Sequence, residues 1–301
     1  MQIVSDVALE AIDTFEVIAP EAQTVPFVYS SPHSGTAYLR EFLAQSKLDV
    51  RTLRRSEDAF VDELFAAAPD VGAPMLRAMI PRSFLDLNRE PLELDPEMFE
   101  DAVPDHANTT SHRVNGGLGT IARIVSNGAE IYRGKLRYRD AERRIELVYV
   151  PYHRRLRTLI DDIRARFGCA ILIDCHSMPS IGGPLDQDSG RQRADVILGD
   201  RFGRSCSPIL VATAERTLRE LGYRVFRNNP YAGGFTTQHY GRPSEAVHAL
   251  QIELNRALYM DENRIDRTPL MPGVRDDMTI LMRALADVDP ALLYPAKKAA
   301  E

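Results

Sequence analysis

The feature that most constrains the fold is an apolar run, residues 170–173, which ends directly in the polar sequence Asp174-Cys175-His176-Ser177. A short uninterrupted run of Ala, Ile and Leu is typical of a strand that is buried on both faces. Such strands belong to parallel sheets covered by helices, which carry their chemistry at the carboxyl ends of the strands. The imidazole of His176 is therefore expected at the functional edge of a sheet.

Other segments repeat this pattern of apolar strands separated by helices. Further strand candidates are mostly continuous apolar runs, at about residues 24–31, 74–81, 194–199, 223–228 and 247–253. The clearest helix has apolar side chains at spacings of three and four between Tyr149 and Phe167, before Gly168 ends it. Two more helices are predicted, from Ser56, as the N-cap, to about residue 68, and from about residue 208 to 221.

This alternation predicts an α/β fold with three layers, α/β/α, around a central, largely parallel sheet. The stretch from about residue 90 to 130 has weak periodicity and is predicted to be a long excursion over the site. No repeat and no Gly/Ser-rich or Pro-rich linker divides the chain, so residues 1–301 are predicted to form a single domain.

The net charge limits the classes of partner. At −6, the chain lacks the basic footprint that nucleic acids and acidic membrane surfaces require, so we expect a small-molecule ligand, with no nucleic acid and no membrane as partner. No window reaches about 18 consecutive apolar residues, and the first residues do not resemble a signal peptide. We therefore expect a cytoplasmic protein. Its three cysteines form no CxxC pair, so a metal would be held by histidines and carboxylates.

A second histidine, His33, follows another apolar run in the sequence Ser-Pro-His-Ser-Gly, residues 31–35. Two imidazoles, His33 and His176, at strand ends leave room for one carboxylate and a water in a catalytic zinc site. Glu57 and Asp58 are the candidates for the carboxylate, and only one of the adjacent pair can readily face the metal. Acids at the start of a helix also complement the helix dipole without any metal, so both candidates stay open.

Glu253 ends the apolar run 247–253. A carboxylate at the end of a buried strand is costly unless it has a task, and a metal-activated water requires a general base. Glu253 is therefore a candidate catalytic base, with an ion pair to Arg256 as the alternative.

Two guanidiniums follow another predicted strand and lie beside an amide: Arg82, and Arg89 with Asn88. Because arginine binds carboxylates bidentately, they predict an acidic substrate, and ion pairs with neighbouring acids are the alternative. The turn-rich segment 228–237 is predicted to form a substrate-facing wall. Its candidate substrate contacts are Tyr231, Gly233, Gly234 and Thr237.

Other hydrolase signatures are absent from the sequence. There is no GxSxG nucleophile elbow and no HExxH helix. Cys175 and His176 are neighbours on one predicted strand and point to opposite faces, so they do not form a nucleophile–base pair.

Six motifs, in order between about residues 25 and 260, together resemble the N-formylglutamate amidohydrolase family. They occupy residues 31–35, 57–64, 80–89, 174–179, 229–234 and 251–256. The resemblance implies a phosphorylase/hydrolase-like fold of the zinc-carboxypeptidase type, with a mixed eight-stranded sheet between helix layers. It also implies hydrolysis of an amide on a small acidic N-acyl amino acid.

The resemblance further implies roles for individual residues. His33 and His176 would bind Zn²⁺ with Asp58, which is favoured over Glu57, and Glu253 would be the general base. Asn88 and Arg89 would hold a substrate carboxylate, and Arg82 is a candidate donor to the oxyanion.

One departure widens the range of substrates. Relatives dedicated to histidine breakdown carry an Asp-Thr-Asp run followed by Trp, whereas this chain has Ser-Glu-Asp-Ala at residues 56–59. N-formylglutamate is the default substrate, and other N-acyl amino acids stay open. The alternatives are a metallo-carboxypeptidase or amidase acting on peptides or cell-wall fragments, and a non-catalytic protein that binds acidic ligands.

Overall fold

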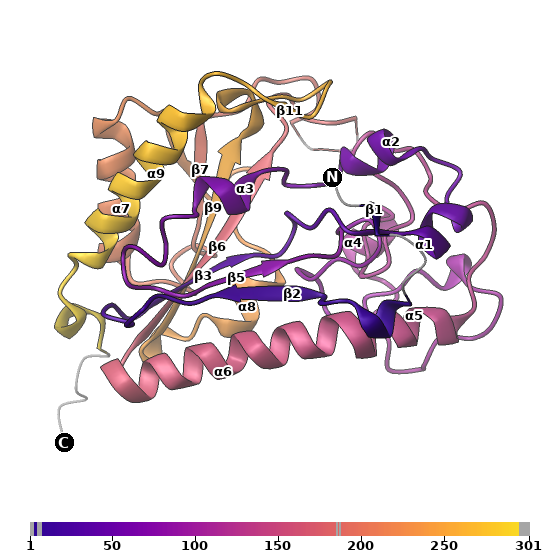
Figure 1. Cartoon of the computed structure of the whole chain (residues 1–301), viewed down its shortest axis with the longest axis horizontal. Coiled ribbons are helices and arrows are strands. Elements are labelled where there is room, and N and C mark those ends of the chain that lie inside the picture. The colour runs from indigo at the N-terminus through magenta and orange to yellow at the C-terminus, as the bar shows by residue number, and fades with distance from the viewer. Residues whose placement is uncertain (1–2, 5–7, 185, 187, 295–301) are drawn as a thin grey trace.

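A mixed seven-stranded sheet lies between two layers of helices in the computed structural model, which describes residues 3–4, 8–184, 186 and 188–294 (Figure 1). Across the sheet, the strand order is β2-β5-β3-β6-β9-β7-β8. The pairs β2–β5 and β7–β9 are antiparallel and the other four are parallel. The strands are β2 Phe15–Ile18, β3 Phe27–Ser31, β5 Met75–Ala78, β6 Ala170–Met178, β7 Val196–Gly199, β8 Val225–Arg227 and β9 Val247–Asn255.

All six strands predicted from apolar runs are present, and the sheet is largely parallel, as predicted. The prediction missed β2, a partly buried edge strand whose Phe-Glu-Val-Ile sequence is too short to stand out. The described sheet has seven strands, one fewer than the eight that the family resemblance implied. The remaining strands are two-residue pairs, namely β1 Ile3–Val4 with β4 Tyr38–Leu39 and β10 Met260–Asp261 with β11 Asp266–Arg267.

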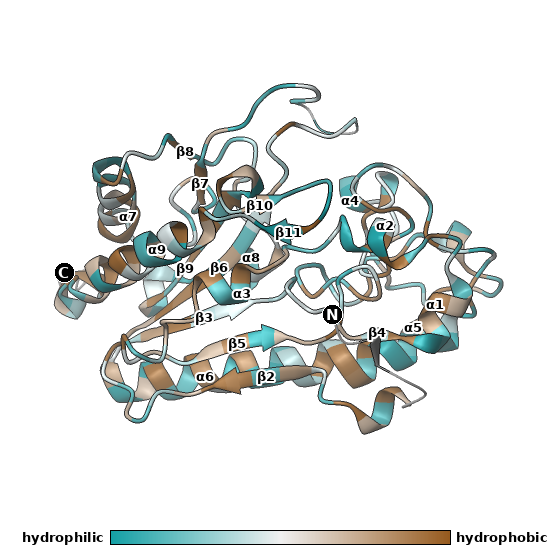
Figure 2. Cartoon of the chain, turned by 45° about the horizontal axis from the view of Figure 1, so that its top comes forward, coloured by the Kyte–Doolittle hydropathy of each residue, from teal (hydrophilic) through white to brown (hydrophobic). Residues whose placement is uncertain are grey.

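The helices cover both faces of the sheet, and their brown apolar sides can be followed in Figure 2. One apolar cluster joins α5, α6 and α8 to the sheet, and a second joins α3, α7 and α9 to its other face. In Figure 1, α6 runs along one side of the sheet, and α7 and α9 lie on the opposite side. The helices are α1 Arg40–Gln45, α2 Val50–Arg54, α3 Val61–Leu64, α4 His112–Asn115, α5 Tyr138–Arg144, α6 Val150–Phe167, α7 Pro208–Glu220, α8 Phe235–Tyr240 and α9 Met271–Ala286.

The alternation of side chains along β6 decides which groups can reach the site. Leu172 packs in the cluster under α6, whereas Ile173 and Cys175 pack in the cluster on the opposite face. Because successive side chains on a strand point to opposite faces, His176 is directed away from Cys175. Burial raises the pKa of the Cys175 thiol well above its ordinary value, so it is unsuited to act as a nucleophile.

The helix predicted from Ser56 to about residue 68 is wrong for most of its length. Only α3, a single helical turn, forms there. The backbone N–H of Asp58 donates to the carbonyl of His33 at 3.0 Å, outside any helical pattern. Phe60 has φ of +67°, a left-handed conformation that interrupts a right-handed helix. This segment therefore follows its contact with the His33 turn rather than its local helix preference.

The excursion predicted over residues 90–130 is largely irregular, with α4 and a short 3₁₀ turn at Pro96–Met98. It lies against the segment that follows β5. The N–H of Asp86 donates to the Thr120 carbonyl at 2.8 Å, and Arg89 Nε donates to the Leu118 carbonyl at 2.8 Å. The excursion thus supports one wall of the candidate site.

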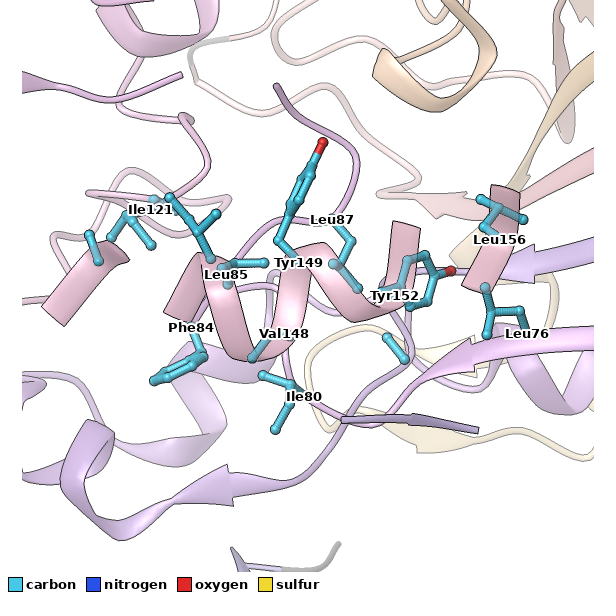
Figure 3. Close-up of a cluster of buried hydrophobic side chains, with 14 of the residues drawn as sticks. Leu76, Ile80, Phe84, Leu85, Leu87, Ile121, Val148, Tyr149, Tyr152 and Leu156 are labelled. Atoms are coloured by element: carbon cyan, nitrogen blue, oxygen red, sulfur yellow. The ribbon is translucent and has the colours of Figure 1, made fainter. Parts of the chain in front are cut away.

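The start of α6 and the turn before it hold the segment after β5 by hydrogen bonds. A π-helical turn at Ile145–Tyr149 continues α5 into α6. Figure 3 shows the cluster around Val148, Tyr152 and Leu156, from which the ring of Tyr149 reaches away. The Tyr149 hydroxyl donates to the Arg89 carbonyl at 2.7 Å, and His153 Nε2 donates to the Leu87 carbonyl at 2.9 Å. Within the described residues, no helix is long and apolar enough to cross a membrane.

The packing of α6 can be tested at Leu156, which is fully buried. We expect Leu156→Ala to lower the free energy of unfolding by about 2–5 kcal/mol, because it removes buried apolar atoms and leaves a cavity. The same substitution at the exposed Leu270 is the control and should change it by less than about 0.5 kcal/mol. Urea denaturation measures both. Equal effects at the two positions would contradict the assigned core.

The stability should depend on pH through His153. Burial lowers the pKa of His153 to about 4. An unfolded histidine titrates near 6.5, so between pH 6.5 and 4 the unfolded state binds a proton that the folded state excludes. The contribution of His153 to the free energy of unfolding is therefore fully present above pH 6.5. It falls as the pH drops toward 4, by at most about 3 kcal/mol. His153→Gln should be less stable at pH 7 but should lose less stability over this range.

Denaturation curves at several pH values, with the exposed His106→Gln as control, measure this difference in slope. A His153→Gln protein with the wild-type slope would remove His153 as its cause.

Candidate metal centre and active site

Three parallel strands bring the candidate residues to one edge of the sheet. His33 follows the end of β3, His176 lies near the end of β6, and Glu253 lies near the end of β9. The register of β6 and β9 places His176 directly beside Glu253. Because the three strands run in the same direction, their carboxyl ends meet, as the sequence predicted.

Asp58 reaches this edge from a turn that is tied to the His33 turn. Besides the hydrogen bond from the Asp58 N–H to the His33 carbonyl, the Ser34 hydroxyl donates to the Asp58 carbonyl at 3.2 Å. One backbone hydrogen bond and one side-chain hydrogen bond thereby join two chain segments 25 residues apart. The position of the Asp58 carboxylate is therefore determined by the same contacts that hold the His33 ring.

His33, Asp58 and His176 form a buried cluster whose ligand atoms all lie within 4.8 Å of one another. Asp58 Oδ2 is 2.8 Å from His176 Nδ1 and 3.2 Å from His33 Nδ1. The centres of the two rings are 4.8 Å apart. The structure thus brings together the two histidines and one of the two carboxylates that the sequence left open.

A carboxylate holds the other nitrogen of each ring. Asp86 Oδ1 lies 2.7 Å from His33 Nε2, and Asp174 Oδ2 lies 3.0 Å from His176 Nε2. His33 Nε2 donates to Asp86, whereas His176 Nε2 lies 3.0 Å from both Asp174 Oδ2 and the Asn88 amide nitrogen. The Nδ1 atoms, which face Asp58 Oδ2, are the nitrogens whose lone pairs a bound metal ion would take. Metal-binding histidines are oriented in this way by carboxylates behind them.

This donor set fits a divalent metal ion. Two Nδ1 atoms and a carboxylate oxygen approach one point, and either protons or a metal ion must lie between them, because as bare acceptors they would repel one another. Ligand atoms around a tetrahedral zinc at 2.0–2.1 Å are separated by roughly 3.3 Å, close to the distances between Asp58 Oδ2 and the two rings. The chemistry and closeness of these groups therefore fit a metal ion held by His33, Asp58 and His176.

Glu57 lies outside this cluster. Its carboxylate accepts hydrogen bonds from the Tyr38 hydroxyl at 2.7 Å and from Arg54 Nε at 3.0 Å. Burial raises the pKa of Glu57, against the charge of Arg54. The adjacent acids thus face different ways, as expected, with Asp58 toward the histidines and Glu57 toward Tyr38 and Arg54.

Two guanidiniums border Asp58. Arg256 Nη2 donates to Asp58 Oδ1 at 3.1 Å, and Arg82 Nη1 lies 3.9 Å from the same oxygen. Arg256 therefore contacts Asp58 rather than Glu253, the ion pair considered from the sequence. Burial would raise the pKa of Asp58, but hydrogen bonds from His176 and His33 outweigh it and hold the pKa well below its ordinary value.

Glu253 is 7% exposed and faces the same side of the sheet as His176. Its Oε1 accepts a hydrogen bond from Gln251 Nε2 at 2.7 Å. Burial raises the pKa of Glu253 to about 7, against the opposing charge of His176. A carboxyl group with this pKa can both accept and release a proton at neutral pH, which is what a general base and acid requires.

The Asn88–Arg89 pair lies at the same edge but is heavily engaged with the protein itself. Asn88 Oδ1 accepts from the Thr236 N–H at 2.8 Å, and Asn88 Nδ2 lies 3.0 Å from His176 Nε2 and 3.3 Å from Asp174 Oδ2. Arg89 donates to the carbonyls of Leu118 and Asn88, and its Nη2 lies 3.6 Å from Asp86. Both side chains are therefore fixed before any substrate binds.

The predicted wall, residues 228–237, packs against the site through its glycines. The Gly234 N–H donates to Gln251 Oε1 at 2.7 Å, and a Cβ on Gly234 would lie 2.6 Å from the Asn88 amide. Thr237 is buried and its hydroxyl donates to the Gly234 carbonyl at 2.9 Å. Gly233 has φ of +119°, a conformation that favours glycine. The partly buried Tyr231 lies under the Arg193 guanidinium at 5.1 Å.

Sequence reasoning assigned no role in the site to Asp86, Asp174 or Gln251, and it considered Arg256 only as an ion-pair partner of Glu253. The sequence did contain a signal for Asp174 and Gln251. Each lies two residues before a candidate site residue on the same strand, Asp174 before His176 and Gln251 before Glu253, and side chains at this spacing share a face. The contacts of Asp86 with His33 and of Arg256 with Asp58 join segments 53 and 198 residues apart, and no local pattern predicts them.

The three-layer fold and the buried cluster beside a glutamate define the class of candidate metal-dependent hydrolases. Residues 25–260 match the family described as N-formylglutamate amidohydrolase. The chain is 32% identical over 250 residues to an N-formylglutamate deformylase of Pseudomonas aeruginosa, covering 82% of this chain and 86% of that protein. It is 29% identical over 241 residues to an N-formylglutamate deformylase of Pseudomonas putida, covering 79% and 83%.

The comparison with solved structures agrees. The N-formylglutamate amidohydrolase from Ralstonia eutropha JMP134 has a TM-score of 0.85 and 37% identity, with 92% of this chain and 98% of that chain covered. A protein of Agrobacterium tumefaciens with 16% identity and a TM-score of 0.62 shares the fold, over 91% and 96% of the two chains. The chain belongs to the N-formylglutamate amidohydrolase family.

The carboxylates behind the histidines give a test of the metal centre. We expect Asp86→Asn and Asp174→Asn each to weaken zinc affinity by about 10–100-fold, because an amide no longer holds the Nε2 proton as firmly. Asp276→Asn, at a side chain 75% exposed, is the matched control. Competition with a chromophoric chelator measures the affinities. Wild-type affinity in both variants would show that the two carboxylates do not support a metal site.

Proposed function

We propose that this chain is a zinc-dependent amidohydrolase that releases formate from N-formylglutamate or cleaves a related N-acyl amino acid. The observation that carries the proposal is the convergence of His33, Asp58 and His176 on one point beside Glu253, in a member of this family. The curated relatives are named for the deformylation of N-formylglutamate. Two imidazoles and one carboxylate form a donor set that suits zinc and leaves a position for water or substrate.

The charges around the site support an anionic substrate. Four buried carboxylates and three guanidiniums surround the cluster: Asp58, Asp86, Asp174 and Glu253, with Arg82, Arg89 and Arg256. With all of these groups ionised their net charge is −1, and a bound divalent ion would change it to +1. Such a site attracts an acidic small molecule more strongly than a neutral one.

When bound, the ion supplies Lewis-acid chemistry, by polarising the amide carbonyl and making water more acidic. In the proposed reaction, the Glu253 carboxylate accepts the proton of the attacking water. It then delivers this proton to the amide nitrogen as the C–N bond breaks, so that formate and the amine of glutamate leave. The pKa of Glu253, raised by burial to about 7, suits both steps.

The guanidiniums have different proposed tasks. Arg82 is the most accessible of the three guanidiniums, with 22% of its side chain exposed, and it lies close to Asp58. We therefore propose that Arg82 stabilises the oxyanion that develops during the reaction. Arg89 offers Nη2 to a substrate carboxylate, because its other contacts go to backbone carbonyls. The Asn88 amide is occupied at both ends, so we assign to it the positioning of Asp174 and of α8 rather than contact with substrate.

The wall 228–237 is proposed to contact substrate through Tyr231 and the backbone at Gly233 and Gly234, while Thr237 supports the turn. Three free, buried cysteines support an enzyme of a reducing compartment, and we propose the cytoplasm.

The proposal is tested by formate release and amine release from zinc-loaded protein over a panel of N-formyl and N-acetyl amino acids. We expect N-formylglutamate to be hydrolysed, and Glu253→Gln to lower kcat by about 10²–10⁴-fold because the general base is lost. The zinc content of the variant should stay at the wild-type level, because Glu253 lies outside the cluster of ligands. Glu220→Gln, at a side chain 65% exposed, is the control.

The alternatives have distinct outcomes. Cleavage of peptides or cell-wall fragments without action on formyl amino acids would identify a metallo-carboxypeptidase or amidase. Binding of acidic ligands with neither zinc uptake nor turnover would identify a non-catalytic relative. Wild-type turnover in a Glu253→Gln protein that holds stoichiometric zinc would exclude Glu253 as the base.

A further inference from the structure

Gln251 is a buried amide that touches both the candidate base and the candidate substrate wall. It is 4% exposed. Its Nε2 donates to Glu253 Oε1 at 2.7 Å, and its Oε1 accepts from the Gly234 N–H at 2.7 Å. The partners determine the orientation of the amide, because a carboxylate only accepts hydrogen bonds and a backbone N–H only donates them.

The strand geometry explains why Gln251 can do this. Gln251 and Glu253 are two residues apart on β9, so both side chains lie on the face of the sheet that carries His176. On the neighbouring strand β7, Gly199 lies opposite Gln251, and a Cβ on Gly199 would lie 2.9 Å from the backbone of Ala232 and Gly233. The absence of a side chain there lets the wall lie close against β7, beside Gln251.

The wall is held from the other side by Asn88. Gly234 is the residue before α8, and it lies between the Gln251 amide and the Asn88 amide. Asn88 contacts Asp174, which orients His176, so the two amides link the wall to the metal cluster and to the base separately. Gln251 is the link to the base.

We propose that Gln251 is a positioning residue that fixes the rotamer of the Glu253 carboxylate and aligns it with the substrate wall. With Oε1 engaged by Gln251, Oε2 is the oxygen left to take the proton in the proposed reaction. This inference rests on the proposed function, because Glu253 matters as a base only if the protein is a hydrolase. Nothing in the role of Gln251 requires contact with substrate or metal.

The decisive experiment is a double-mutant cycle that combines Gln251→Met with Glu253→Gln. Methionine approximates the length of glutamine but neither donates to Glu253 nor accepts from Gly234. We expect Gln251→Met alone to lower kcat by about 10–100-fold, the usual effect of losing a group that orients a reactive residue, with a smaller change in KM. In the Glu253→Gln background the same substitution should change the residual rate by less than about twofold, because its target is already gone.

Two further variants separate positioning from packing. Gln251→Glu keeps the size and the acceptor for the Gly234 N–H but replaces the donor to Glu253 by a second carboxylate. It should lower kcat at least as much as Gln251→Met, because two adjacent carboxylates repel each other and would displace Glu253. Gln238→Met, at an exposed position on α8, is the control and should leave kcat unchanged.

Two results would overturn the proposal. In one, Gln251→Met lowers the rate by the same factor in the wild-type protein and in the Glu253→Gln variant; in the other, Gln251→Met leaves kcat unchanged. If the wild-type protein hydrolyses no N-acyl amino acid, the proposed function fails, and crystal structures of wild type and Gln251→Met then decide the positioning claim alone. A changed Glu253 rotamer in the variant supports it, and an identical rotamer refutes it.

Discussion

The site depends on one carboxylate oxygen, Asp58 Oδ2, on which the Nδ1 atoms of His33 and His176 converge. This arrangement is costly in a buried place unless protons or a metal ion lie between the atoms, since a carboxylate oxygen and two imidazole lone pairs would otherwise face one another. The carboxylates of Asp86 and Asp174 enforce it by holding the opposite nitrogen of each ring. The fold therefore builds a buried centre that could hold a positive ion.

The sheet supplies the precision of this centre. Parallel strands β3, β6 and β9 bring their carboxyl ends together, and the β6–β9 register sets His176 beside Glu253. Apolar clusters on both faces hold the strands, so the polar groups lie on a rigid edge. The buried amides of Asn88 and Gln251 at that edge are satisfied by neighbouring groups, whereas Asp174 Oδ1 has no hydrogen-bond partner among the described residues. Rigid support of this kind pre-organises reactive groups.

Much of the fold could be predicted from the sequence because the central strands are continuous apolar runs and α6 and α7 have clear helical periodicity. The histidines and Glu253 could be found because each lies at the end of such a run. The segment after Ser56 could not, since its backbone follows a contact with His33 that local preferences do not encode. For the same reason Glu57 and Asp58 could not be separated without the positions of Tyr38 and Arg54.

The central claim is that His33, Asp58 and His176 bind one divalent ion. Anomalous X-ray diffraction at the zinc edge, from crystals of zinc-loaded protein, tests it most directly. The account predicts one strong peak bonded to Nδ1 of both histidines and to the Asp58 carboxylate, with Glu57 uninvolved. No peak between these three side chains in crystals grown with zinc, or a peak bonded to Glu57 in place of Asp58, would contradict it.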